Sequence, residues 1–314
     1  MIDDGELQTD PIDDARRDLE PVADVGIAPP GYRLPAATQL GHVSLQVSDL
    51  ARSLEYYQGV LGLAVLERAD VAAMLGTTDE ITPLVQLSER KGARPIPQHG
   101  RLGLYHFAIL LPGRAALGRY VQYLAEIGAQ AGASDHLVSE ALYLRDPDGL
   151  GIEVYADRPR SSWRAVDRQL QMATDPLDFE DLIRAGAGEP WRGMPPGTTK
   201  GHVHLHVGNL EQASAFYHAT LGLDKMVWSY SSALFLAAGG YHHHLGVNTW
   251  AGPRARTPTD DDARLLEWRV VLPSETDMRA AVDSLRGSGY DARADERSWL
   301  VTDPWNTAVR LVSR

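Results

Sequence analysis

Apolar and polar residues alternate in two separate stretches of the chain, and each stretch then changes to a helical pattern. Residues 41–63 align without gaps on residues 201–223, and ten positions are identical. Alternation with a period of two indicates a half-buried strand, whereas apolar residues three or four apart indicate an amphipathic helix. Gly62 and Gly222 end the two helical patterns, as glycine commonly does at helix C-termini. Both copies therefore predict a strand followed by a helix.

A second, fainter repeat lies between the two copies and after them. Residues 104–112 and 265–273 each read as an apolar strand that ends in proline. A helical pattern follows each strand, at about 115–127 and 276–286, and a strand pair around an Asp-Pro turn comes next. The chain is thus predicted to hold four strand–helix–strands modules, at about residues 38–93, 100–158, 198–253 and 262–314.

The second module ends in a strand pair whose centre carries a carboxylate. Residues 146–149, Asp-Pro-Asp-Gly, have the composition of a β-turn. In the strand that follows, alternation places Glu153 on the face opposite to Ile152 and Val154. A glutamate at the centre of a strand is either solvated on an open face or faces a group that pairs with its charge. Histidines at strand positions elsewhere in the chain favour the second interpretation.

Two segments lie outside the modules. Residues 1–37 contain nine acidic and three basic side chains and predict a mobile or loosely packed acidic arm, with at most a short helix near residues 13–19. Residues 159–197 form the predicted linker between modules one and two (38–158) and modules three and four (198–314). Within this linker, the stretch from Asp175 predicts a short helix with an Asp N-cap, a proline in the first turn and a glycine stop.

Composition limits the chemistry that the chain can support. Its 314 residues, 44% of them hydrophobic, suffice for two ordinary domains. The formal charge of −12 argues against a nucleic-acid partner, because such partners require clustered Lys and Arg. The chain has no cysteine, so a metal site must use histidine and carboxylate. We expect a cytoplasmic protein, since no apolar run approaches the ~18 residues of a membrane span and the acidic N-terminus is unlike a signal peptide.

Four such modules with histidines on strand positions resemble the vicinal oxygen chelate superfamily, which includes glyoxalase I, bleomycin-resistance proteins and type I extradiol dioxygenases. Residues 104–112, 139–149, 201–207 and 239–250 are similar to signatures of two-domain catechol 2,3-dioxygenases. The resemblance implies an α+β fold of four tandem βαβββ modules, which form two cupped, barrel-like mixed sheets. It also implies an Fe(II) site, for which Mn(II) is the alternative, held by two histidines and a glutamate.

The resemblance assigns two ligands directly and leaves the third open. His106 and Glu153, both in module two, match the family's second histidine and its glutamate. The first histidine is His202 if module two pairs with module three, and His42 if it pairs with module one. The family places an acid–base histidine some 40 to 50 residues after the first ligand. From His202 this spacing reaches residues 242–244, whereas no histidine stands at that distance from His42, so the sequence favours His202.

Further site residues follow from the same resemblance. Strand alternation allows either His243 alone, or His242 together with His244, to face the cup. The remaining candidates are Tyr143, expected to hydrogen-bond the reacting oxygen, and the polar residues His136 and His204 around it.

Module four lacks a second ligand pair. Glu267 and Arg310 stand at the positions that match His106 and Glu153. They cannot complete a metal triad, and opposite charges at these positions indicate a structural ion pair. The chain is therefore expected to build one metal site only.

The implied activity is extradiol cleavage, in which a small aromatic diol of the catechol type is opened with dioxygen to a 2-hydroxymuconic semialdehyde product. The alternatives are a hydroquinone-cleaving dioxygenase of the same superfamily and a non-catalytic, ligand-sequestering protein of the bleomycin-resistance kind. Neither nucleic acid nor membrane is expected as a partner, and a homo-oligomer is expected.

Overall fold

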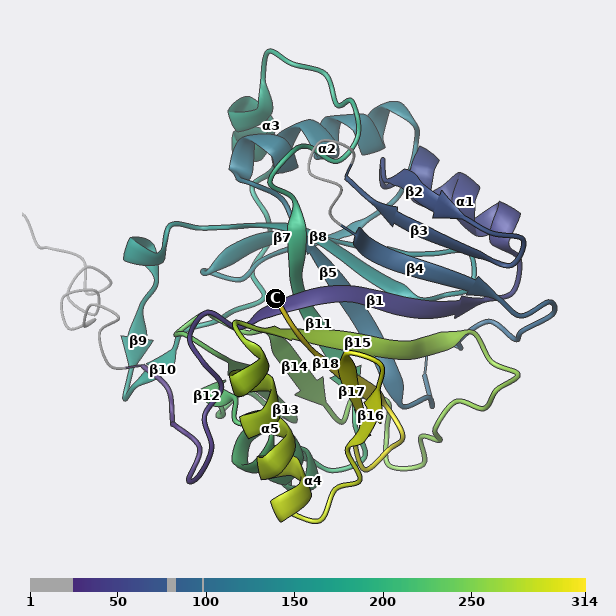
Figure 1. Cartoon of the computed structure of the whole chain (residues 1–314). Helices are drawn as coiled ribbons and strands as arrows, with labels where there is room; N and C mark the ends of the chain where they lie inside the picture. The colour runs from purple at the N-terminus through teal and green to yellow at the C-terminus, as the bar shows by residue number, and fades with distance from the viewer. Residues whose placement is uncertain (1–24, 78–82, 98) are drawn as a thin grey trace, which may run out of the picture.

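The computed structural model of the chain describes residues 25–77, 83–97 and 99–314 (Figure 1). The helices are α1 (Leu50–Gly59), α2 (Arg114–Glu126), α3 (Phe179–Gly186), α4 (Leu210–Ala213), α5 (Glu275–Gly287), the 3-10 helix η1 (Arg160–Ser162) and the π-helix η2 (Ser214–Thr220). The strands are β1 (Gln39–Val47), β2 (Ala64–Arg68), β3 (Ala72–Gly76), β4 (Pro83–Glu89), β5 (Gly103–Leu110), β6 (Gly132–Asp135), β7 (Ser139–Arg145), β8 (Gly151–Asp157), β9 (Ala165–Val166), β10 (Gln169–Leu170), β11 (Thr199–His206), β12 (Asp224–Val227), β13 (Ala233–Ala237), β14 (Leu245–Asn248), β15 (Arg264–Leu272), β16 (Arg293–Asp295), β17 (Ser298–Thr302) and β18 (Ala308–Ser313). None of the described helices has the length and apolarity that a membrane crossing requires.

The strands of the four modules form two eight-stranded sheets with the same plan. The first sheet has the order β16-β17-β18-β15-β1-β4-β3-β2, and the second has the order β12-β13-β14-β11-β5-β8-β7-β6. At the centre of each sheet two strands pair antiparallel, β1 with β15 and β5 with β11. Each of these central strands also pairs in parallel with the last strand of its own module. The predicted α+β fold of four βαβββ modules in two mixed sheets is confirmed.

The modules pair across the two halves of the chain. Modules one and four build the first sheet, and modules two and three build the second. Figure 1 shows the purple strand β1 alongside the yellow-green strand β15, although the two are far apart in the sequence. Each eight-stranded sheet therefore contains strands from residues 38–158 and strands from residues 198–314. The sequence left open whether module two pairs with module one or module three, and in the structure it pairs with module three.

The alternating pattern of the strands divides each sheet into an apolar and a polar face. Two small clusters aside, apolar strand residues pack against the helices in one continuous core. Its fully buried members include Leu45 and Tyr57 in module one and their equivalents Leu205 and Tyr217 in module three. Burial of each such side chain contributes about 1.5–3 kcal/mol to the free energy of unfolding. The polar residues of the same strands, the histidines among them, are left for the opposite face.

Two helices differ from the prediction. The helix of module three is α-helical only in α4, where the Asn209 side chain caps it, and then widens into the π-helix η2. At the end of η2 the carbonyl of Thr220 accepts a hydrogen bond of 2.7 Å from Ser284 of α5. In the linker, α3 begins at Phe179 and its N-cap is Asp178 instead of Asp175. The backbone of Asp175 pairs with a strand end of module two, which keeps that residue out of the helix.

The described part of the N-terminal segment, residues 25–37, is anchored to module three at several points, although many of its side chains are exposed. The Leu34 side chain is 3% exposed, and the backbone of Ile27 bridges to Lys225 of β12. The Arg33 guanidinium donates two hydrogen bonds of 2.8 Å to the Asp224 carboxylate. An apolar anchor and an ion pair thus attach residues 25–37 to module three, and the expected arm of residues 1–37 stays a prediction. The helix predicted near residues 13–19 lies outside the described residues.

The Asp-Pro turn of module two connects the second sheet to the first. Asp148 is fully buried, and its carboxylate accepts hydrogen bonds from the Ser48 backbone and hydroxyl at 2.7 Å each, and from Arg52 at 2.5 Å. The neighbouring Asp146 accepts a hydrogen bond of 3.2 Å from Tyr57. Since Ser48, Arg52 and Tyr57 belong to module one, this turn joins the two sheets.

Substitution of Asp148 by alanine should destabilise the fold. The change leaves the half-buried Ser48 amide and hydroxyl without their carboxylate acceptor, and a hydrogen bond to a charged group contributes about 1.5–3 kcal/mol. Urea unfolding should show a free energy of unfolding lower by about 2–4 kcal/mol than that of the wild type. Asp70→Ala, in an exposed loop of module one, is the control and should change it by less than about 0.5 kcal/mol. Equal stability of the two variants would show that the turn does not hold the sheets together.

Candidate metal centre and adjoining cavity

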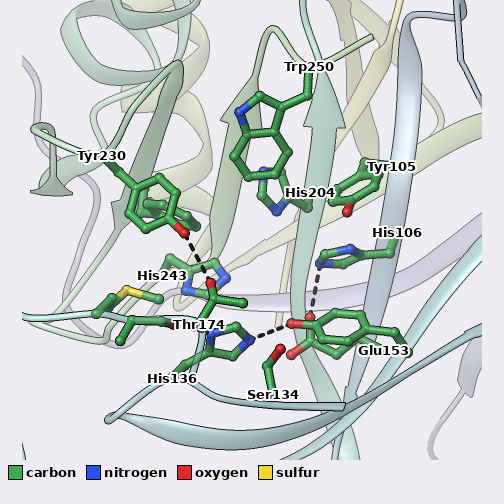
Figure 2. Close-up of a pocket in the computed structure, with 14 residues that line it drawn as sticks. Tyr105, His106, Ser134, His136, Glu153, Thr174, His204, Tyr230, His243 and Trp250 are labelled. Atoms are coloured by element: carbon green, nitrogen blue, oxygen red, sulfur yellow. Dashed lines mark hydrogen bonds and ion pairs between the residues drawn. The ribbon is translucent and has the colours of Figure 1, made fainter. Parts of the chain in front are cut away.

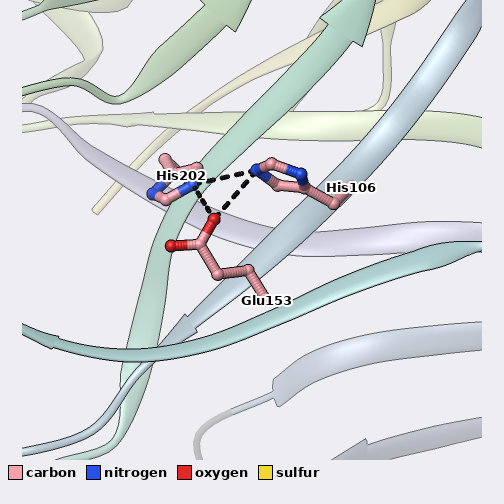
Figure 3. A group of neighbouring side chains, drawn as sticks. All are labelled: His106, Glu153 and His202. Carbon is pink, nitrogen blue, oxygen red and sulfur yellow. Dashed lines mark hydrogen bonds and ion pairs between the residues drawn. The ribbon is translucent and has the colours of Figure 1, made fainter. Parts of the chain in front are cut away.

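Side chains from three neighbouring strands of the second sheet converge on one point (Figure 3). His202 lies on β11, His106 on β5 and Glu153 on β8. The Nε2 atoms of His106 and His202 lie 2.9 and 3.0 Å from Oε2 of Glu153, and 3.3 Å from each other. The structure thus places His202, one of the two candidates for the first histidine, beside His106 and Glu153.

The protonation states of these residues suit a divalent cation. All three side chains are buried. Burial lowers the pKa of His202 to about 4, so its imidazole is neutral at pH 7. Burial alone would raise the pKa of Glu153, but His202 and His106 outweigh this effect and hold that pKa well below its usual value. A neutral imidazole and an ionised carboxylate are the forms that bind metal ions.

The spacing of the three atoms also fits a metal ion. Two ligand atoms at right angles, each about 2.1 Å from an ion, lie about 3 Å apart. The observed separations of 2.9, 3.0 and 3.3 Å therefore match one face of an octahedron. Nδ1 of His202 is buried without a hydrogen-bond partner in the described part of the chain. Two imidazoles and one carboxylate leave coordination positions open, as in non-haem iron oxygenases.

Of the three consecutive histidines 242–244, only His243 faces the cavity beside this site. The run lies in the loop between β13 and β14. The His243 ring lies over the His202 ring, with centroids 4.0 Å apart, and lines the cavity. His242 is buried behind it, and His244 turns away and accepts a hydrogen bond of 3.1 Å from the Ala238 amide. Of the two arrangements that alternation allowed, the structure has His243 alone.

A chain of hydrogen bonds sets the tautomer of His243. Asp157 Oδ1 lies 2.9 Å from Nε2 of His242, whose Nδ1 lies 2.7 Å from Nδ1 of His243. A carboxylate only accepts, so Nε2 of a neutral His242 carries the proton and its Nδ1 accepts from His243. Nε2 of His243 then keeps its lone pair. Burial holds the pKa of His243 well below its usual value, so this ring is a neutral base at pH 7.

Tyr143 and His136 form a second hydrogen-bonded pair at the cavity. Nδ1 of His136 donates to the Ala173 carbonyl at 2.6 Å, so Nε2 accepts from the Tyr143 hydroxyl at 2.5 Å. Burial, with the charge of Glu153 nearby, raises the pKa of Tyr143 well above its usual value. The phenol therefore stays protonated. Both residues line the cavity, and the Ala173 carbonyl comes from the linker.

His204 also lines the cavity, on the same strand as His202. Its Nε2 accepts a hydrogen bond of 2.9 Å from the Asn248 side-chain amide. Gly246 leaves room for the ring, because a Cβ atom there would lie 2.8 Å from Cγ of His204. The neighbouring strand β14 thus fixes the His204 ring, because Asn248 donates to it and Gly246 has no side chain that would clash with it.

The cavity has a volume of about 370 Å³ and an aromatic wall (Figure 2). In Figure 2, Trp250 lies at the top of the view and Glu153 at the bottom, with the cavity between them. The sequence missed most of this wall, which consists of Tyr105, Tyr230, Phe235, Trp250 and the linker residues Met172, Ala173 and Thr174. Tyr105 and Trp250 stand within motifs that the sequence singled out, whereas Tyr230 and Met172 carry no sequence signal. No Lys or Arg is among the described lining residues.

The equivalent position in the first sheet holds an ion pair. Arg310 contacts Glu267 at 2.7 and 2.8 Å, and Arg269 contacts the same carboxylate at 3.0 Å. The expected structural ion pair is present. His42 lies near this cluster, since the charges of Arg269 and Glu267 act on its pKa, and it is absent from the His106–Glu153 group. In the described part of the chain, one group of three has metal-ligand spacing.

The fold and this site define a protein of the vicinal oxygen chelate type. The family model "Glyoxalase/Bleomycin resistance protein/Dioxygenase superfamily" matches residues 39–154. The chain is 44% identical over 270 residues to catechol-2,3-dioxygenase of Bacillus subtilis, and this match covers 85% of the chain and 94% of the relative. It is 30% identical over 162 residues to biphenyl-2,3-diol 1,2-dioxygenase 3 of Rhodococcus globerulus, with 48% of the chain and 85% of the relative covered.

Solved structures share the fold at low sequence identity. Glyoxalase I of Zea mays superposes with a TM-score of 0.52 at 18% identity, covering 88% of this chain and 92% of the maize chain. A Bacillus subtilis structure assigned to a dioxygenase has a TM-score of 0.61 at 12% identity, covering 90% and 86% of the two chains. The chain belongs to the glyoxalase/bleomycin resistance protein/dioxygenase superfamily. The predicted enzyme class, an oxidoreductase of the extradiol dioxygenase type, is confirmed by the 44% identity over most of the chain.

The site predicts how metal content responds to single substitutions. Wild-type protein loaded with Fe(II) without oxygen and then desalted should hold about one metal ion per chain, measured by elemental analysis. Glu153→Ala and His202→Ala each remove a ligand atom and should lower this to below about a tenth. His42→Ala is the matched control and should keep the wild-type content. If His42→Ala loses the metal and His202→Ala keeps it, the ligands belong to the first sheet.

Proposed function

We propose that this protein is an extradiol dioxygenase that opens catechol-type aromatic diols with dioxygen to 2-hydroxymuconic semialdehyde products. The observation that carries the proposal is the convergence of His106, His202 and Glu153 at the edge of an aromatic cavity that also holds a neutral histidine base. The relative named catechol-2,3-dioxygenase supports the same substrate class. Iron(II) is the proposed metal, and Mn(II) fits the same ligands.

The three ligands would hold an ion that supplies a Lewis-acid and redox centre with open positions for both substrates. The chain's own residues then have three tasks. They remove a proton from the diol, they orient the reacting oxygen atoms, and they exclude water from the ring.

His243 is the proposed acid–base group. Its Nε2 lone pair is free because the hydrogen bonds from Asp157 through His242 fix the proton on Nδ1. A diol hydroxyl in the cavity can give its proton to this atom, and the same atom can return the proton to the product later. Asp157 and His242 act through His243 and are positioning residues.

Tyr143 and His136 are proposed to orient the oxygen atoms of the reacting pair. The Tyr143 hydroxyl stays protonated and donates to His136, so its oxygen lone pair is free to accept a hydrogen bond from a substrate hydroxyl. His204, held by Asn248, supplies a further polar contact on the same face.

The cavity wall favours neutral, apolar diols. Tyr230, Phe235 and Trp250 offer ring faces for stacking, and no cationic side chain lines the described wall to pair with a carboxylate substituent. Alkyl- or aryl-substituted catechols should therefore be better substrates than catechols with an acidic side chain. A ligand-sequestering role has no use for the buried triad and is not favoured. Assembly as a homo-oligomer and a cytoplasmic location stay predictions.

The direct test mixes Fe(II)-loaded protein with catechol under anaerobic conditions and then admits air. We expect a yellow semialdehyde and the uptake of one molecule of dioxygen per catechol, and neither with Glu153→Ala. Hydroquinone in place of catechol tests the alternative branch. Uptake of dioxygen without a yellow product, or turnover of hydroquinone only, would refute the proposal.

Removal of the acid–base group should separate turnover from binding. His243→Ala should keep the metal and still bind catechol, while kcat falls by about 10²- to 10⁴-fold, the usual contribution of a positioned acid–base residue. Metal content and catechol affinity are measured on the same preparation. His244→Ala, whose ring turns away from the cavity, is the control and should retain most of the activity. Full activity of His243→Ala would remove this residue from the mechanism.

The positioning role of Asp157 can be tested by replacing one of its carboxylate oxygens with an amide NH₂ group. Asp157→Asn can donate to Nε2 of His242, which favours the opposite tautomer of His242 and places a proton donor against His243. We expect kcat to fall by about 10- to 100-fold with unchanged metal content. The pH profile of kcat should change as well, which a purely structural effect would not produce. An unaltered profile with unaltered kcat would contradict the relay.

A further inference from the structure

The linker crosses the wall of the cavity beside the triad. Met172, Ala173 and Thr174 line this cavity, and every other described lining residue belongs to module two or module three. We call residues 172–174 the strap. The cavity volume of about 370 Å³ lies in the range of pockets that hold drug-sized ligands. The cavity therefore has room for a diol ring with a substituent, and the strap is part of the wall that such a substituent can meet.

Both ends of the strap are anchored by hydrogen bonds. Before the strap, Oε1 of Gln169 accepts from the backbone amides of Trp228 and Ser229 at 2.7 and 2.8 Å. After it, the backbones of Asp175 and Asp135 exchange two hydrogen bonds of 2.9 and 3.0 Å. Trp228 and Ser229 belong to module three, whereas Asp135 belongs to module two. The strap thus bridges the two modules that build the cavity.

One hydrogen bond between side chains joins the strap to the wall of module three. The hydroxyl groups of Thr174 and Tyr230 lie 3.0 Å apart. The Tyr230 ring packs against two further aromatic residues of the wall, with centroids 5.8 Å from Phe235 and 6.3 Å from Trp250. Two neighbouring rings and one hydrogen bond therefore fix the position of Tyr230, and the bond closes the wall between the linker and module three.

This pair of hydroxyls lies across the cavity from the metal ligands. In Figure 2, Tyr230 and its bond to Thr174 are on the left of the view, and His106 and Glu153 are on the right. A diol that binds at the triad through both hydroxyls directs the opposite edge of its ring, carbon atoms 4 and 5, away from the three ligands. A substituent on carbon 4 then points toward the strap. This step rests on the proposed function, because it requires the diol to bind at the triad.

We propose that the hydrogen bond between Thr174 and Tyr230 limits the size of the substituent that the diol carries on carbon 4. While the bond is intact, the strap and the Tyr230 ring form a closed wall, and catechol or a small 4-alkylcatechol fits in front of it. A longer chain fits only when the bond is broken. Thr174 and Tyr230 are thus specificity-determining residues, and the preferred substrates are catechols with a small apolar group on carbon 4.

The test compares kcat/KM for 4-methylcatechol and 4-hexylcatechol with Fe(II)-loaded protein. The wild type should prefer 4-methylcatechol by at least about tenfold. Tyr230→Phe and Thr174→Val each remove one hydroxyl and keep the shape of the side chain, so each should reduce this preference about three- to tenfold, the usual contribution of one hydrogen bond. Tyr290→Phe, at a tyrosine outside the lining of this cavity, is the control and should keep the wild-type preference.

The double variant separates loss of this bond from two unrelated effects. Both substitutions remove the same interaction, so the double variant should change the preference no more than either single variant does. Thr174 is exposed and Tyr230 is half-buried, so the variants should fold. The proposal is overturned if the wild type shows no preference, if both single variants keep the full preference, or if the two effects multiply in the double variant.

Binding measured without oxygen distinguishes this proposal from the proposed reaction. The Kd of 4-hexylcatechol should fall about three- to tenfold in Tyr230→Phe and in Thr174→Val, while the Kd of 4-methylcatechol should change by less than about twofold. If the wild type cleaves neither catechol, the proposed function fails, and these Kd values alone decide on the size limit. Equal Kd values of 4-hexylcatechol for the wild type and both variants would overturn it.

Discussion

The antiparallel pairing of β5 with β11 is the constraint on which the site depends. It joins module two to module three and sets the register in which His204 faces His106 across the strands. The parallel pairing of β5 with β8 then brings Glu153 to the same point. No single module holds all three ligand atoms. Two imidazoles from neighbouring strands stabilise the buried carboxylate of Glu153, so the site depends on the strand pairing of this sheet.

The two sheets share a plan and differ in chemistry. In the second sheet, two histidines and one carboxylate leave a donor set that suits a metal ion. In the first sheet, Arg310 neutralises Glu267, and the pair fills the equivalent place with its own hydrogen bonds. The buried turn at Asp148 and the tyrosine–aspartate bonds to Tyr57 and Tyr217 hold the halves together. The second sheet thus carries the metal site, and the first sheet supports it.

Much of this could be predicted from the sequence, because alternation and helical spacing are local. The four modules and the positions of His106 and Glu153 follow from such patterns and from the resemblance to a family. The choice between His202 and His42 depended on strand pairing, which is not local. His243 could not be selected by alternation because its run lies in a loop. Tyr230 and Met172 reach the cavity only through tertiary packing, and no spacing in the sequence marks them.

Anomalous diffraction at the iron edge, from crystals of Fe(II)-loaded protein, tests the metal site most directly. We expect one strong anomalous peak per chain, in contact with Nε2 of His106, Nε2 of His202 and the Glu153 carboxylate. We expect no peak between His42 and Glu267. A peak in the first sheet, or a peak that does not contact Glu153, would contradict this assignment of the metal ligands.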